Sequence, residues 1–493
     1  MATSTPREDP PIKLRTGRKM IFTDYSEITD ENILAVVEQG YIDHAPNRSD
    51  IVYLHKYYKG EQPILWKVKE VRPEINEKIV INIANEIVAF KVGYLVGKPI
   101  QYISSVADQR VSDAVASLND MMRNEGKITK DRSLVEWQMI AGTGYRLVLP
   151  KKKRGEKVPW EFYTLDPRNA FVIYANDYTQ RPLVGVSYRI DINGNVTLTA
   201  YTENRIYTID KGSNSFTAED NPLGWIPIIE YPANTARLGA FEVVLTVLDA
   251  VNELDSNRLD SVKQFVESLL VIYNADFEDP DNVTANSIRQ AGMVQLRSTG
   301  ENNADLKVIS EKLDQTNTET LKQSLLNMIR EIVGMPSQSD GSTGDSSNNG
   351  AVILKNGWQG AETRAEAFEA QFYEPERTFL QIVSAISRDA NVLEFDPDDV
   401  DIRFTRRNYE DILSRSQTLV SLLNTDYVHP RIAYEISGAV VDSEGAFQEG
   451  LAWHKEQMNE STADRRTEQP TDENTGNTTG LSDRSADEEE SAY

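Results

Sequence analysis

The sequence predicts an α+β fold in which helices flank an antiparallel sheet and two long helices enclose a small α/β module. Three observations predict this class. The helical spacing of apolar residues gives way to short runs rich in Val, Ile, Thr and aromatic residues between about positions 145 and 209. Helical spacing resumes at about Leu238 and continues, with one mixed interruption, to Gly334. A polar, glycine-rich stretch at 337–350 then separates two strongly helical segments.

Composition narrows the function classes. The chain of 493 residues is long enough for two to four domains. Its formal net charge of −25 argues against a groove-reading transcription factor, but not against a protein past which DNA slides. Cysteine is absent, which excludes disulfides, iron–sulfur clusters and thiolate metal sites. The most apolar long window, 79–97, is interrupted by two asparagines, a glutamate and a lysine, so we expect a buried helix there and no membrane span.

The N-terminal part is predicted to be helical after a flexible arm. Residues 1–27 form this arm, because the stretch begins polar and proline-containing and has no apolar signal core. Thr29 or Asp30 caps a first short helix, which Gly40 ends. Further helices are expected from apolar spacing at 51–58, 76–96, 111–125 and 130–141.

The sheet region consists of short strands separated by turn residues. Strands are expected at 145–150, 160–165, 170–174, 183–192, 196–201 and 204–209. The dipeptide Asn193-Gly194 predicts a tight hairpin between two of them. A proline-rich exit at 221–232 leads out of the sheet.

The C-terminal half is predicted to be mostly helical. A helix of about 30 residues starts near Leu238, at about 45 Å an unusually long one. A mixed segment at 272–314 precedes a second long helix, in which Thr316 and Glu319 form a capping box and Gly334 ends the helix. The later elements are helices at 351–373 and 379–390 around a kink at Pro375, a strand at 400–404, helices at 409–423, 429–437 and 443–459, and a disordered acidic tail at 459–493.

No catalytic, metal or cofactor site is predicted. The four histidines are scattered without metal-ligand spacing. The segment Gly93–Pro99 resembles a phosphate loop only superficially, because the glycine spacing is one residue short and Pro99 replaces Ser or Thr. The aspartates at 396–401 are interpreted as an acidic turn before a strand rather than a calcium loop. The basic run at 151–157 is interpreted as a solvated hairpin tip rather than a phosphate contact.

Three stretches, in their order along the chain, carry a family resemblance. They are Tyr57-Tyr-Lys-Gly60, the segment from Asn82-Ile-Ala-Asn85 through Gly93-Tyr-Leu-Val-Gly97-Lys-Pro99, and Asn349-Gly-Ala-Val-Ile-Leu-Lys355. Together with the helix–insert–helix–loop–helix plan, they make the chain resemble the portal proteins of tailed double-stranded-DNA bacteriophages. The resemblance is strongest to the subfamily typical of long non-contractile-tailed phages of Gram-positive bacteria, and it covers roughly residues 28–458.

The resemblance implies a ring of twelve subunits, or thirteen in some isolated preparations, around a central channel. It also implies an assignment of domains, by position in this sequence. These domains are a wing at 28–237, a stem helix at 238–272, a clip at 273–314, a second stem helix at 315–335, a tunnel loop at 336–350, a kinked wing helix at 351–396 and a crown at 397–458.

The candidate site residues follow from that assignment. The tunnel loop would project toward DNA, with two aspartates that repel phosphate and no Arg or aromatic residue to read bases. Its residues are Ser337, Gln338, Ser339, Asp340, Gly341, Ser342, Thr343, Gly344, Asp345, Ser346, Ser347, Asn348, Asn349 and Gly350. The candidate phosphate contacts on the stem helices are Arg258, Lys263, Lys322 and Arg330, whose alternative role is solvated or intersubunit ion pairing.

The expected function is a structural DNA conduit without catalytic activity or cofactors. The implied partners are double-stranded DNA without sequence specificity, the terminase large subunit, a head-completion adaptor, and the major capsid and scaffolding proteins. The expected location is the portal vertex of the capsid in the virion, with assembly in the host cytoplasm. Two alternatives are another capsid-associated protein, such as an adaptor or minor head protein, and a hydrolase whose acidic residues assemble only in three dimensions. Adaptors are far shorter, and no nucleotide or metal motif supports the hydrolase.

Overall fold

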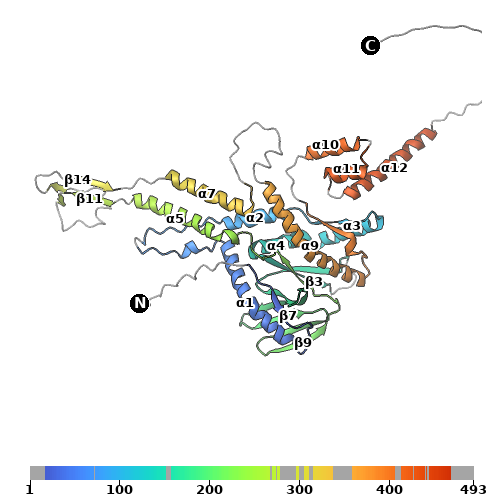
Figure 1. The fold of residues 1–493 in the computed structure, drawn as a ribbon, viewed down its shortest axis with the longest axis horizontal. Helices are drawn as coiled ribbons and strands as arrows, with labels where there is room; N and C mark the ends of the chain where they lie inside the picture. Colours follow the sequence, from blue (N-terminus) through green and yellow to red (C-terminus); the bar gives the residue numbers. More distant parts are fainter. Residues whose placement is uncertain are drawn as a thin grey trace, which may run out of the picture. The chain divides into compact units, whose positions relative to one another are not determined.

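The structure, a computed structural model, describes residues 17–70, 73–151, 157–266, 269–273, 275–277, 296–298, 305–309, 315–336, 358–405, 412–425, 427–438, 440 and 443–467. The chain divides into two compact units, Met1–Asp411 and Ile412–Tyr493, and each is described by itself. The predicted α+β class is confirmed, since long helices and antiparallel sheets coexist in the first unit (Figure 1). Within the described ranges, no helix combines the length and apolar character that crossing a bilayer requires.

Most of the predicted helices are present. In the first unit the helices are α1 (Ile33–Tyr58), α2 (Ile83–Leu95), α3 (Gln109–Asn124), α4 (Lys127–Ala141), α5 (Leu245–Val266), α7 (Gln315–Val333) and α9 (Trp358–Asp389). Three short 3-10 turns accompany them, η1 (Pro63–Trp66), η2 (Glu242–Val244) and η3 (Pro397–Asp399). The second unit contains α10 (Ile412–Leu423), α11 (Pro430–Ser437) and α12 (Ser443–Thr467). The α12 helix continues to Thr467, past residue 459, where the acidic tail was expected to begin. Ala and Arg between residues 459 and 467 favour helix and allow an existing helix to propagate.

The predicted sheet region forms two separate sheets. A six-stranded sheet has the order β1-β5-β6-β7-β8-β9, and a three-stranded sheet has the order β10-β3-β4. Their strands are β1 (Ile21–Thr23), β3 (Thr143–Pro150), β4 (Trp160–Leu165), β5 (Ala170–Ala175), β6 (Pro182–Ile190), β7 (Val196–Tyr201), β8 (Arg205–Asp210), β9 (Ser215–Asp220) and β10 (Ile228–Pro232). The predicted hairpin at Asn193-Gly194 joins β6 to β7, and Gly194 has the positive φ of +84° that favours glycine. The prediction that residues 221–232 lead out of the sheet was wrong for the last five, because Ile228–Pro232 form β10, which pairs with β3.

Three two-stranded pairs complete the sheet structure of the first unit. The strand β2 (Gln101–Ser104) pairs with β15 (Val400–Arg403), which lies far away in the sequence. Within the mixed segment, β11 (Leu269–Tyr273) pairs with β14 (Asp305–Ile309), and β12 (Ala275–Phe277) pairs with β13 (Leu296–Ser298). The short helix expected at 282–290 lies outside the described residues.

The expectation of a loose arm is wrong for residues 17–27. There β1 pairs in parallel with β5, and the side chain of Arg18 is buried against Glu242, with 2.5 Å between guanidinium and carboxylate. A three-residue strand and a single long-range ion pair leave no periodic signal in the sequence, so the prediction could not find them. Residues 1–16 lie outside the described part.

The first long helix also differs from the prediction, which ended a short helix at Gly40. Instead α1 passes through Gly40 and Pro46 as one helix. A Cβ atom at Gly40 would lie 2.7 Å from Cδ1 of Ile173 on β5, so this glycine permits close packing on the sheet and does not act as a helix stop. Burial of Ile33, Val36 and Val37 against the six-stranded sheet holds the helix in place.

Three other boundaries differ. Residues 76–82 are extended instead of helical, and α2 begins at Ile83 with Asn82 as its cap. The first long helix of the C-terminal half is interrupted, because η2 precedes α5 and β11 follows it. At Pro375, where a kink or a restart was predicted, the helix α9 does not restart, since one helix includes this proline.

The main core contains a cluster of four buried charges where α4, β3 and α9 meet. Arg146 of β3 contacts Asp131 of α4 at 2.5 Å and Glu376 of α9 at 2.9 Å, and Lys127 bridges the same two carboxylates at 2.6 and 2.9 Å. The hydroxyls of Tyr102 and Tyr231 also donate to Glu376. All four charged side chains are at least 95% buried. We call these residues the charge cluster.

The charges in this cluster cancel, which makes their burial tolerable. Burial by itself raises the pKa of Glu376, but the cations of Lys127 and Arg146 outweigh it and hold the pKa below its usual value. A carboxylate with a lowered pKa in the folded state stabilises the fold above about pH 4, and this contribution is lost only as the pH falls through the lowered pKa. The cluster therefore stays intact at neutral pH.

We predict that Glu376→Gln lowers the free energy of unfolding by about 3–5 kcal/mol at pH 7, because it leaves Arg146 and Lys127 with one buried anion fewer. Urea unfolding followed by tryptophan fluorescence measures the change. The matched control is Glu374→Gln, an exposed position on the same helix that should change stability little. Equal urea midpoints for the two variants would contradict a stabilising role for the cluster.

Candidate functional site

The candidate site is the pair of helices α5 and α7, which run side by side in Figure 1. Leu248 and Val251 of α5 and Ile329 and Val333 of α7 are buried in the same core cluster. The predicted boundaries of α7 are confirmed within a residue or so: the helix runs from Gln315 to Val333, and the positive φ of Gly334, +69°, follows its last turn. The pair is thus anchored in the main core at one end.

Two ion pairs cross between these helices. The guanidinium of Arg258 on α5 contacts Glu319 on α7 at 2.6 Å, and the amine of Lys322 on α7 contacts Asp255 on α5 at 2.8 Å. The predicted capping-box residue Glu319 therefore pairs with the neighbouring helix. Both pairs are partly exposed, so solvent weakens each of them, but together they fix the register of the two helices.

The four candidate phosphate contacts thus have different surroundings. Arg258 and Lys322 are engaged between the helices, and Lys263 of α5 pairs with Glu77. Arg330 is half-buried near the end of α7. Three of the four positive charges are therefore neutralised by carboxylates of the same chain, which weakens any attraction for phosphate at those positions.

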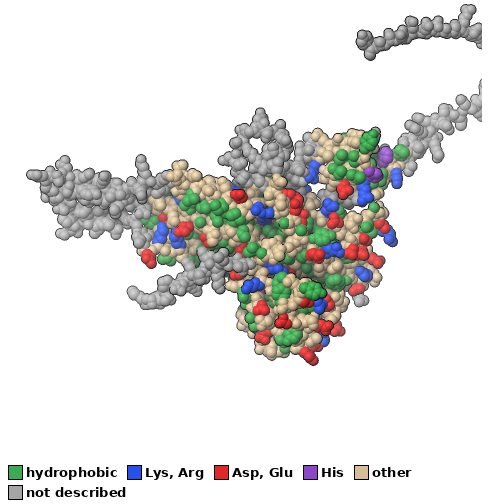
Figure 2. Space-filling view, viewed as in Figure 1, with side chains coloured by type: hydrophobic (Ala, Val, Ile, Leu, Met, Phe, Trp, Pro, Cys, Tyr) green, Lys and Arg blue, Asp and Glu red, His purple; other side chains and the backbone are tan. Residues whose placement is uncertain are grey.

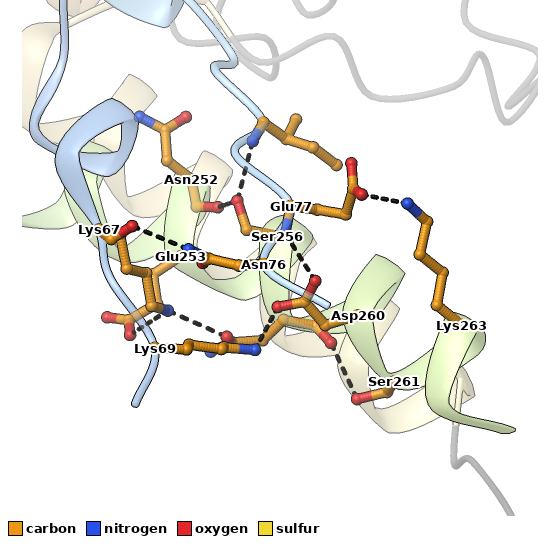
Figure 3. Close-up of polar contacts among 12 residues, drawn as sticks. Lys67, Lys69, Asn76, Glu77, Asn252, Glu253, Ser256, Asp260, Ser261 and Lys263 are labelled. Atoms are coloured by element: carbon orange, nitrogen blue, oxygen red, sulfur yellow. Dashed lines mark hydrogen bonds and ion pairs between the residues drawn. The ribbon is translucent and has the colours of Figure 1, made fainter. Parts of the chain in front are cut away.

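A segment that the sequence did not predict, and whose described residues form no helix or strand, braces α5 on another side. We call residues 67–82 the strap; of these, 71–72 lie outside the described part. Figure 3 shows the strap running along α5, with polar side chains of the helix pointing toward its backbone. The backbone amides of Glu77, Ile79 and Ile81 donate to side chains of α5, and we call these bonds the ladder.

The ladder has a simple geometric basis. Its acceptors are the carboxylate of Asp260 at 2.7 Å, the hydroxyl of Ser256 at 3.0 Å and the amide oxygen of Asn252 at 2.8 Å. These acceptors are four residues apart, or about 6 Å along a helix. The donors are two residues apart, or about 6.6 Å along an extended chain. Every second amide of the strap can therefore meet every fourth residue of α5.

Ion pairs reinforce the ladder at both ends. Lys67 contacts Glu253 at 2.9 Å, and Lys69 pairs with Asp260. Burial raises the pKa of Asp260, but the hydrogen bonds from Lys69 and the Glu77 amide outweigh it and keep the pKa below its usual value. The carboxylate is therefore ionised at neutral pH, and its contribution to stability is lost only below about pH 4, as the pH falls through its lowered pKa.

The tunnel loop predicted at 337–350 lies outside the described residues, but the residues before and after this part of the chain are described. Arg364 of α9 donates to the carbonyl of Glu331 at 3.3 Å, and its side chain lies against Gly334. The ends of α7 and the start of α9 are thus close together. Because Met335 and Pro336 follow directly, the loop starts at the end of α7 that is anchored in the core.

The other motifs have structural roles. A Cβ at Gly97 would lie 2.2 Å from the carbonyl oxygen of Gly93, so Gly97 is a packing glycine at the end of α2, as predicted, whereas a Cβ at Gly93 would meet nothing within 4 Å. Asp396 caps η3 just before β15, which confirms the acidic turn. Burial lowers the pKa of His44 to about 4, and its ring stacks on Phe171. Among the described residues, no group of three or more acidic, histidine or cysteine side chains could hold a metal ion.

The class of protein follows from comparison with known families. The sequence model of the family described as "Phage portal protein, SPP1 Gp6-like" matches residues 41–470. This chain belongs to that family, and it has a phage portal function at the capsid vertex. Family membership excludes the adaptor and minor-head-protein alternatives, and the resemblance inferred from the three sequence stretches and the order of elements is confirmed.

The chain is also similar to one curated protein and to chains of two solved structures. The portal protein of Bacillus phage SPP1 is 22% identical over 407 residues, which covers 75% of this chain and 74% of that protein. Two solved structures are described as "Neck of empty GTA particle computed with C6 symmetry" and "Neck of native GTA particle computed with C12 symmetry". Their matching chains are 12% and 13% identical, with TM-scores of 0.42 and 0.40, and the matches cover 80% of this chain and 94% of each of theirs.

We predict that Ser256→Ala, which removes the central acceptor of the ladder, speeds hydrogen exchange in residues 77–81 roughly tenfold, the effect of losing a hydrogen bond worth about 1.4 kcal/mol. Hydrogen exchange read by mass spectrometry measures it. Ser261→Ala on the same helix is the control, since the Ser261 hydroxyl donates to the helix carbonyl of Asn257 and its loss should leave the strap unchanged. Unchanged exchange in the first variant would show that the ladder does not hold the strap.

Proposed function

We propose that copies of this chain form a ring whose channel carries double-stranded DNA during packaging, retention and ejection. The observation that supports this proposal is the paired arrangement of α5 and α7, which carries the β pairs at its far end and the start of the tunnel loop at its anchored end. In this proposal the wing is 28–237, the stem helices are 238–272 and 315–335, the clip is 273–314, the tunnel loop is 336–350, the wing helix is 351–396 and the crown is 397–458.

Charge supports a channel through which DNA slides. The chain carries a net charge of −25, and three candidate cations of the stem are paired with carboxylates. A channel wall with many free cations would hold phosphates strongly and in a salt-dependent manner. A wall whose cations are neutralised lets a polyanion pass with brief contacts, as a conduit requires.

The remaining assignments complete the proposal. We expect a structural, non-catalytic role without cofactors, with DNA bound without sequence specificity. The proposed partners are the terminase large subunit, a head-completion adaptor, and the major capsid and scaffolding proteins. Assembly would take place in the host cytoplasm before the protein is incorporated into the virion.

We predict that the purified chain forms a ring of twelve or thirteen copies, because α7 exposes apolar side chains that a neighbour would cover. Twelve copies of the 55.6-kDa chain amount to about 670 kDa. Light scattering gives the mass, and negative-stain imaging counts the subunits. A mass of a single chain at every salt and protein concentration would contradict the ring.

We predict that deletion of residues 339–348 leaves assembly intact but impairs DNA packaging or retention. A loop without apolar side chains buries little area, and shortening it changes the closure entropy by only about 0.6 kcal/mol per halving. The measurement is an in vitro packaging assay.

The charge of the same loop offers a second test in that assay. Changing Asp340 and Asp345 to Lys should slow passage, because the new cations attract phosphate in a confined space. The matched control changes the same two residues to Asn, which removes charge without adding attraction. Normal packaging and retention by the deletion and the lysine variant would leave the loop with a linker role only.

A further inference from the structure

Two apolar patches remain exposed on the α5–α7 pair and its strap. On α7, the side chains of Leu321, Met328 and Ile332 are 51%, 44% and 43% exposed, and their spacing places them on one face of the helix. We call them the α7 stripe. Figure 2 shows apolar side chains gathered over α7. A row of half-exposed apolar side chains along one helix typically marks an interaction surface.

The second patch lies on the strap side of α5. Trp66 is 53% exposed, Val68 is 81% exposed and Leu65 is 36% exposed. We call these three residues the strap patch. Such exposure is costly for the indole and the branched side chain, because each could bury its apolar area against a partner.

The two patches belong to different flanks of α5. The helix contacts the strap through Asn252, Ser256 and Asp260, which are four residues apart and share one face. It contacts α7 through Asp255 and Arg258, which lie on another face. Figure 1 shows α5 between α7 and the strap. One copy of the chain therefore presents two unlike apolar surfaces, one on each side of the same helix.

We propose that the α7 stripe of one copy docks on the strap patch of the next copy. The proposal rests on the proposed ring and names the contact that closes it. Because the two surfaces are different and lie on separate flanks, the contact is head-to-tail, and each copy keeps one free surface of each kind until the ring closes. A two-fold dimer in which like surfaces meet would cover one kind of patch and leave the other exposed.

Charge at the edges of the two patches is complementary. Glu331 is exposed and borders the α7 stripe beside Met328 and Ile332. Lys78 is exposed beside the strap patch, where its amine donates to the carbonyl of Leu65 at 2.7 Å. An ammonium group has three donors, so Lys78 can keep this bond and also meet a carboxylate from the neighbouring copy. Opposite charges at the rim fix the orientation of an apolar contact.

The strap patch is held in shape before any partner arrives. Lys78 ties the strap back to Leu65, the amide of Asn76 donates to the carbonyl of Lys67 at 3.0 Å, and the ladder fixes residues 77–81 on α5. A surface that is already ordered loses less conformational freedom on binding. In this proposal, the ladder holds Trp66 and Val68 in the arrangement that the next copy contacts.

The chain contains no cysteine, which allows a direct test by crosslinking. The two variants are Val68→Cys and Met328→Cys, each in the full-length chain and treated with a bismaleimide after assembly. A mixture of the two variants is expected to give crosslinked pairs at least tenfold more efficiently than either variant alone. Ile192→Cys, a fully exposed residue near the β6–β7 hairpin, replaces either partner as the control and should give no pairs.

The outcomes distinguish a failure of the proposed contact from a failure of the proposed ring. Rings that form without crosslinks in the mixture overturn the proposed contact and leave the proposed function standing. Equal crosslinking by a single variant alone means that like surfaces meet, which also overturns it. A parent chain that stays monomeric overturns the ring and the contact together.

As an independent measure, Trp66→Asp is expected to reduce the assembled fraction at least tenfold, whereas Ile192→Asp leaves it unchanged. Full assembly of the Trp66→Asp variant counts against the proposal.

Discussion

The packing of the first unit depends on the buried guanidinium of Arg146. This group cannot lose its charge and has no access to water, so the protein must supply its partners. Its two carboxylate partners lie on α4 and α9, and Lys127 closes the circle of charges. Aromatic rings fill the remaining space, with the guanidinium carbon 4.6 Å from the centre of Phe379. An apolar contact could slide, whereas these ion pairs hold only while α4, β3 and α9 keep their positions, so the cluster opposes movement of α9 on the sheet.

The same principle, polar groups that must be satisfied in one register, operates again at α5. There the unpaired backbone of the strap finds acceptors on the helix, and the two cross-helix ion pairs align α7 on the other side. The apolar core ends where these helices leave the main body, so polar contacts take over the task of holding them. The projecting helix pair can therefore keep a defined direction with little core of its own.

This division has a consequence for a portal protein. Contacts between copies need apolar surface, and passage of DNA needs surfaces that do not hold phosphate. On α7 the two requirements are met by different faces. Exposed apolar side chains lie along one face, while Lys322 on another face pairs with Asp255 of α5. Ion pairs within the chain fix the two helices, and in the proposed channel they would also neutralise the stem.

The sequence alone determined the features with local causes. The limits of α7, the hairpin at Asn193-Gly194 and most strands follow from periodicity, glycine conformation and side-chain branching, which act over a few residues. The two helices of the candidate site were expected from the same periodicity, although α5 is shorter than predicted, and the motifs led to the family. Only the tertiary structure decided that Gly40 lies inside a helix, that residues 76–82 belong to the strap, and that Arg146 contacts Glu376. Each of these depends on a partner far away in the chain, whose distance in space no local pattern records.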